Sequence, residues 1–132
     1  MTMTKTIVSY LKSRFPTLNS VYLFGSMATK TDAHNSDIDI AILTQFPIED
    51  VSKWDIAQEL AILLKRDVDL IDLATASTVF RYEIITSGSL IYTHDPTKTL
   101  QQEVHWMSEY LDFNETRHEL IKEIQRRGTI YE

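Results

Sequence analysis

Residues 37–43 read D-I-D-I-A-I-L, and this strict alternation constrains the fold more than any other feature of the chain. Successive side chains of a β-strand point to opposite faces, so the three isoleucines share one face, and Asp37, Asp39 and Ala41 share the other. The segment therefore predicts a strand that buries isoleucine in a core and presents two carboxylates on its opposite face.

Apolar spacing and turn residues predict further elements on both sides of this strand. Helices are predicted over residues 5–15, 50–66, 78–87 and 95–128, and the remaining strands over residues 21–24, 67–73 and 89–92. Ser52 and Asp55 resemble a capping pair for the second of these helices. The alternation of strands and helices favours an α/β (α+β) fold, with a small mixed sheet flanked by helices and a long C-terminal helix.

Length and composition limit the classes of protein that the chain can belong to. The 132 residues suit a single domain, 1–132, and the absence of cysteine excludes disulfides, thiolate zinc sites and a cysteine nucleophile. Met1 to Tyr10 lacks the apolar run of a secretion signal, so we expect a cytoplasmic protein with no membrane segment. A net charge of -6 argues against general nucleic-acid binding.

The acidic residues are concentrated in one part of the chain. Residues 31–60 contain seven acids and only Lys53 as a base. Asp37 and Asp39 would lie about 6.6 Å apart along one strand face, where two carboxylates repel unless a cation binds between them or one is protonated. Mg²⁺ suits such a pair because it binds one or two carboxylates together with substrate phosphates. The alternative is a solvated acidic face.

Two further segments fit a phosphate-handling site. Gly25 and Ser26 directly follow a buried strand, where glycine lets the backbone approach a phosphate and serine adds a hydroxyl. Asp69 lies between two apolar residues in the later strand, a costly position for a charge unless a cation or a proton donor faces it. It is the candidate for a third carboxylate.

The combined pattern G-S-x10-D-x-D, followed by the V-D-L strand at residues 68–70, resembles the nucleotidyltransferase fold shared with DNA polymerase beta. Within that superfamily, the short chain and the segment V-D-L-I-D-L look like the minimal nucleotidyltransferases, the MNT antitoxins paired with HEPN-domain toxins. The resemblance covers nearly the whole chain, and its most specific part is residues 25–39.

The resemblance implies transfer of AMP from ATP to a hydroxyl, with release of pyrophosphate. In MNT antitoxins the acceptor is a tyrosine of the cognate HEPN ribonuclease toxin, so a hetero-oligomer with that toxin is implied. Gly25 and Ser26 would hold the triphosphate. Asp37 and Asp39 would bind Mg²⁺, while Asp69 would help bind a second Mg²⁺ and deprotonate the acceptor.

Two other functions remain open at this point. A nucleotidyltransferase for a small acceptor, such as an aminoglycoside, would use the same motif but normally needs more structure to enclose its substrate. A binding-only antitoxin would neutralise its toxin by occlusion. The sequence leaves open whether His34 and Lys30 contact the nucleotide, and whether Arg81 faces the triphosphate or forms a surface pair.

The last helix carries two sets of apolar residues. The stripe of Leu100, Val104, Met107 and Leu111 is interpreted as core packing. The aromatic residues at its edge suggest a partner interface, and they are Trp106, Tyr110 and Phe113.

Overall fold

The computed structural model describes residues 2–25 and 37–126, which form four helices and four strands. The helices are α1 (Met3–Arg14), α3 (Asp50–Leu64), α4 (Thr78–Ser87) and α5 (Pro96–Arg126), and the strands are β1 (Ser20–Phe24), β2 (Ile38–Leu43), β3 (Val68–Asp72) and β4 (Ser89–Thr93). The predicted elements are confirmed, with end points that differ by at most two residues wherever both ends are described. The expected end of the last helix near Gly128 lies outside the described residues.

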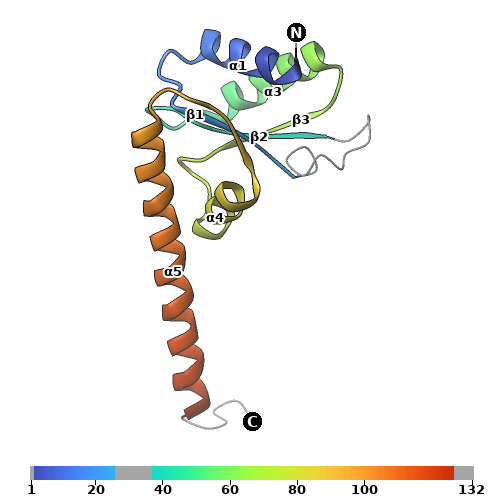
Figure 1. Ribbon diagram of the computed structural model, residues 1–132. Coiled ribbons are helices and arrows are strands. Elements are labelled where there is room, and N and C mark those ends of the chain that lie inside the picture. The colour runs from blue at the N-terminus through green and yellow to red at the C-terminus, as the bar shows by residue number, and fades with distance from the viewer. Residues whose placement is uncertain (1, 26–36, 127–132) are drawn as a thin grey trace.

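The strands form one mixed sheet in the order β3-β2-β1-β4. β1 pairs antiparallel with both β2 and β4, whereas β2 and β3 are parallel. Figure 1 shows α1 and α3 over one face of the sheet and α4 on the other, with α5 running away from the body as a long rod. In the part of the chain that the structure describes, no helix is long and apolar enough to cross a membrane.

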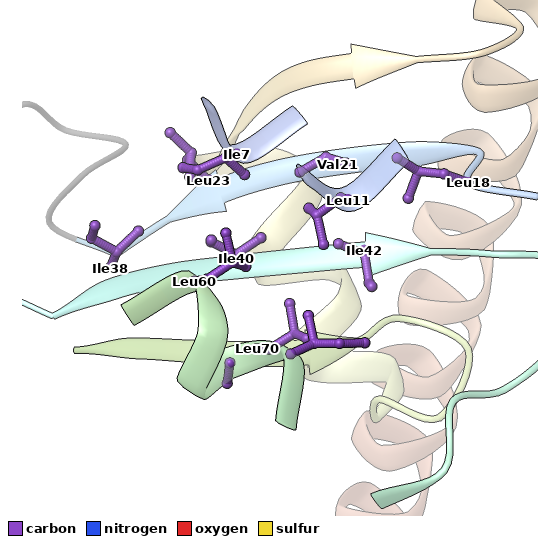
Figure 2. Packing of buried hydrophobic residues seen from close by; sticks show 12 residues of the cluster. Ile7, Leu11, Leu18, Val21, Leu23, Ile38, Ile40, Ile42, Leu60 and Leu70 are labelled. Carbon is purple, nitrogen blue, oxygen red and sulfur yellow. The ribbon is translucent and has the colours of Figure 1, made fainter. Parts of the chain in front are cut away.

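The alternation of residues 37–43 produces the expected two faces. Ile38, Ile40 and Ile42 are fully buried against α1 and α3, where they meet Leu11 and Leu60 (Figure 2). Ala41 points to the other face and joins a smaller apolar cluster with residues of α4 and α5. Because both faces of β2 are covered, this strand is the centre of the fold.

The start of α3 differs from the predicted capping pair. Glu49 is the N-cap residue without a side-chain cap bond, and Ser52 lies inside the first turn. The chain before the helix is held by a tertiary contact instead, because the buried Asp72 carboxylate accepts hydrogen bonds from the backbone N–H of Ile48 at 2.9 Å and of Ala74 at 3.0 Å. The local motif therefore did not decide where this helix begins.

The interpretation of the apolar stripe on α5 as core packing is wrong. Leu100, Val104 and Leu111 are each more than half exposed, while Trp106 is only 4% exposed and packs under α4. Trp106 is therefore a core residue rather than an interface aromatic. The two stripes lie on different sides of one helix, and the position of the helix against the body determines which is covered.

Candidate active site

The sheet brings four of the predicted site residues to one end of its strands. β1 ends where β2 begins, and Phe24 pairs with Asp39, so Gly25 lies beside the Asp39 carboxylate. On the other side of β2, Asp39 is in register with Asp69 of the parallel strand β3. Asp37 directly precedes β2. Residues far apart in the chain thus meet at this end of the sheet, which we call the carboxylate edge.

Gly25 has a role at the carboxylate edge that the sequence pattern alone did not reveal. Its φ of 67° lies in the left-handed region that disfavours side chains. A Cβ built on Gly25 would lie 3.3 Å from Asp39 Cγ and overlap Asp39 Oδ2. The absence of a side chain lets the backbone take this turn and approach the Asp39 carboxylate closely.

Electrostatics distinguish Asp39 from its two neighbours. Partial burial raises the pKa of Asp39, and the charges of Asp69 and Asp37 raise it further. Asp37 and Asp69 are themselves exposed. The expectation that the charge of Asp69 is costly to bury is therefore wrong, because β3 is an edge strand and the Asp69 side chain is exposed to water. The unfavourable environment for a charge is at Asp39 instead. This carboxylate gains most from a cation nearby.

Several candidate residues fall outside the part of the chain that is described. Ser26, Lys30 and His34 all lie in the segment 26–36, so their expected contacts with the nucleotide stay predictions. The described portion of the carboxylate edge consists of Gly25, Asp37, Asp39 and Asp69.

The carboxylate edge has the donor chemistry that Mg²⁺ requires. Within residues 2–25 and 37–126, no group of three or more metal-ligating side chains is already gathered around one point. Mg²⁺ rarely uses such a cage, since it takes one or two carboxylates and completes its octahedron with water and substrate phosphates. Partial burial and, after it, the charges of Asp69 and Asp37 raise the pKa of Asp39, and a cation beside these carboxylates would offset both effects.

Arg81 performs a structural task rather than either of the two considered from the sequence. Its guanidinium donates hydrogen bonds to the backbone carbonyls of Leu73 at 2.8 Å and Ala74 at 2.7 Å. It also lies over the Trp106 ring, 5.2 Å from the centroid. Arg81 therefore links the segment between β3 and α4 to α5 through these hydrogen bonds and the cation–π contact.

A hollow of about 1200 Å³ lies at the opposite end of the strands, lined by Leu43, Thr44 and residues of α1 and α5. Size alone would favour it as a substrate site. The carboxylates lie at the other end of β2, however, and phosphoryl transfer depends on charge and positioning. The carboxylate edge is therefore the candidate active site, and the larger hollow is not.

Comparison with known proteins identifies the family of the chain. Residues 5–97 match the family described as "Polymerase beta, Nucleotidyltransferase", a match that includes β1 to β4 and every residue of the carboxylate edge. The chain belongs to this nucleotidyltransferase family, and the predicted class of fold is confirmed.

The similarity extends to a particular branch of the family. The chain is 42% identical over 86 residues to Protein adenylyltransferase MntA of Shewanella oneidensis, and the match spans 65% of this chain and 62% of that protein. A crystal structure of a toxin–antitoxin with AMP-PNP superposes with a TM-score of 0.82 at 34% identity, covering 92% of this chain and 98% of the other. An MNT antitoxin in complex with tri-AMPylated Shewanella oneidensis HEPN toxin gives a TM-score of 0.78 at 31% identity, covering 93% and 96%. The predicted resemblance to MNT antitoxins is confirmed.

Proposed function

We propose that this protein transfers AMP from ATP to a tyrosine hydroxyl of a HEPN-domain toxin and thereby neutralises it. The observation that carries the proposal is Asp39, held between Asp37 and Asp69 beside the left-handed turn at Gly25 in a chain of the nucleotidyltransferase family. The related structures support both substrates, because one contains a tri-AMPylated HEPN toxin and another contains AMP-PNP, an analogue of ATP.

In the proposed reaction the acceptor oxygen attacks the α-phosphorus of ATP. A bond forms between the tyrosine oxygen and that phosphorus, the α–β phosphoanhydride bond breaks, and pyrophosphate leaves with the electron pair. Asp69 accepts the hydroxyl proton, a role that suits an exposed carboxylate at the rim of the site. Gly25 and Ser26 hold the triphosphate through the backbone and the serine hydroxyl.

Asp37 and Asp39 would hold Mg²⁺, and Asp69 would help to hold a second Mg²⁺, together with oxygens of the substrate phosphates. When bound, Mg²⁺ neutralises charge on the triphosphate and favours ionisation of the attacking hydroxyl. The carboxylates contribute position and charge, which are the main protein contributions to phosphoryl transfer.

The openness of the carboxylate edge favours a protein acceptor over a small one. Asp37 and Asp69 are exposed, and β3 is the outermost strand, so a tyrosine on the surface of another protein can reach both carboxylates. A small hydroxylated acceptor such as an aminoglycoside would need enclosure. We further propose that residues 1–132 act as one minimal nucleotidyltransferase domain, in the cytoplasm, where ATP and the toxin's RNA substrates are found.

The test is intact-mass analysis of a HEPN-domain toxin from the same genome, after incubation with this protein, ATP and Mg²⁺. One or more AMP units should be added, and EDTA should abolish the addition. An unchanged toxin mass together with loss of its ribonuclease activity would establish a binding-only antitoxin instead. Addition of AMP to an aminoglycoside but not to the toxin would favour the small-molecule enzyme.

A further inference from the structure

The large hollow at the far end of the strands differs in charge from the rest of the chain. Its volume is about 1200 Å³, and its walls come from α1, from one end of the strands and from α5. Among the described residues that line it, Lys12, Arg81 and Lys98 are cations, and Glu109 is a carboxylate. The whole chain carries a net charge of -6. The hollow is therefore a local region of positive charge on an acidic protein.

Neighbouring side chains do not neutralise the two lysines of the hollow. In the described part of the chain, neither Lys12 nor Lys98 forms an ion pair with a carboxylate. Lys12 instead lies over the ring of Tyr92, with its Nζ atom 5.4 Å from the ring centroid. The carboxylate of Glu109 contacts Nε2 of His105 at 3.1 Å. Two positive charges are therefore available to an anion that enters the hollow.

Aromatic and hydrogen-bonding groups complete the lining. Phe15 at the end of α1 and Tyr92 of β4 are half-buried and contribute ring surface. His94 and Gln102 contribute imidazole and amide groups, which can donate or accept hydrogen bonds. Lysine ammonium groups bind phosphate, and aromatic rings stack on heterocyclic bases. The hollow therefore combines the groups that recognise the two halves of a nucleotide.

We infer that this hollow is a binding site for a free nucleoside phosphate, separate from the nucleotide that reacts at the carboxylate edge. Lys12 and Lys98 would hold the phosphates, and Phe15 and Tyr92 would pack against the base. Leu43, in the wall of the hollow, is four residues along β2 from Asp39, a distance of about 13 Å. A ligand in the hollow thus leaves the carboxylate edge free.

The distribution of charge favours a small anion over a nucleic-acid strand. A strand needs basic residues along an extended track, because each successive phosphate must be neutralised. The part of α5 that follows Glu109 carries Asp112, Glu115 and Glu119, which would repel phosphates that continue beyond the hollow. Ligand pockets commonly measure about 300–1,000 Å³, so an open hollow of this size has room for a nucleotide.

The hollow and the carboxylate edge differ in their need for metal. Phosphates that approach the carboxylate edge meet three carboxylates, so they need Mg²⁺ to offset the repulsion. Phosphates in the hollow meet lysine ammonium groups directly. Binding of a nucleotide in the presence of EDTA therefore reports the hollow alone.

The experiment is calorimetric titration of the protein with ATP in EDTA. Wild type should bind one ATP per chain, and the Kd should rise at least about tenfold in Lys12→Glu/Lys98→Glu. The matched control is Lys5→Glu/Lys122→Glu, which changes the net charge equally on the same two helices outside the hollow and should bind like wild type. Asp39→Asn should also keep the metal-free binding. Mg²⁺ with a non-hydrolysable ATP analogue should still raise the Tm of Lys12→Glu/Lys98→Glu, which shows that its fold and its carboxylate edge are intact.

Three results overturn the inference directly: no binding in EDTA, loss of metal-free binding in Asp39→Asn, or an equal loss of affinity in both double variants. Pyrophosphate that binds as tightly as ATP would assign the hollow to inorganic anions and also overturn it. The same holds for a single-stranded RNA oligonucleotide that binds more tightly than ATP. Weaker binding of both pyrophosphate and adenosine, with the loss confined to Lys12→Glu/Lys98→Glu, supports the inference whether or not the protein transfers AMP.

Discussion

Leu60 in α3 and Leu120 in α5 are both helical leucines, yet Leu60 is fully buried against the sheet and Leu120 is 61% exposed. The first belongs to a body whose helices each have a sheet face to cover, and the second to a helix that continues past the end of its neighbour α4. The body therefore buries its own core and contains the carboxylate edge, whereas the distal half of α5 leaves apolar side chains exposed. The predictions below test that division.

The largest effect is expected for chemistry at the carboxylate edge. Asp39→Asn keeps the shape of the side chain and removes the charge that Mg²⁺ and the triphosphate need, so AMP transfer should fall about 10²- to 10³-fold, equivalent to about 3–4 kcal/mol. Rates are read from the toxin's intact mass over time. Asp55→Asn, an exposed carboxylate on α3, is the control and should transfer at the wild-type rate. Equal rates in all three proteins would remove Asp39 from the site.

The same substitution at two leucines compares the two regions directly. Leu60→Ala leaves a cavity in the core and should lower the free energy of unfolding by about 2–5 kcal/mol. Leu120→Ala removes a side chain that the described chain leaves exposed and should change it by less than about 0.5 kcal/mol. Urea denaturation of the isolated protein measures both. A large loss of unfolding free energy in Leu120→Ala would show that this side chain is already covered in the free protein.

Gly25→Ala should disturb both stability and activity. The left-handed φ and the overlap with Asp39 Oδ2 together should cost about 1–3 kcal/mol of unfolding free energy, and AMP transfer should be lost with the displaced carboxylate. In an Asp39→Ala background the overlap disappears. The loss of unfolding free energy caused by Gly25→Ala should then shrink to about 1 kcal/mol, which is the cost of the left-handed φ without the overlap. An equal penalty in both backgrounds would contradict the steric account.

The smallest effect is a pH dependence of stability without nucleotide or Mg²⁺. Since the pKa of Asp39 is raised in the folded protein above its ordinary value of 3.8, the folded state holds that proton more tightly than the unfolded chain does. Stability is therefore lost as pH rises from 3.8 through the folded pKa. The Tm of Asp39→Asn should exceed that of wild type at pH 7, and the difference should vanish at pH below 3.8. A difference in Tm that does not change with pH would exclude the ionisation of Asp39 as the cause.

Much of the site could be predicted because its residues are adjacent in sequence or follow a strong period. The alternation around Asp37 and Asp39 defines one strand face without knowledge of any neighbour, and Gly25 ends an apolar run too short for a helix. Asp69 was predicted as the third carboxylate from its place between two apolar residues, and in the structure it is in register with Asp39 on the neighbouring strand. Its exposure could not be predicted, because the sequence does not show that β3 forms the outer edge of the sheet.

The sequence by itself determined the elements, the buried isoleucine face and the pair of carboxylates, since each follows from a period of two or of three to four residues that local geometry enforces. Only the tertiary structure decided which stripe of α5 is covered, where α3 begins, what Arg81 contacts and how closely Gly25 approaches Asp39. These depend on which surfaces the sheet places opposite one another. A helix with two apolar stripes carries no local signal of which stripe packs against its own body and which stays exposed.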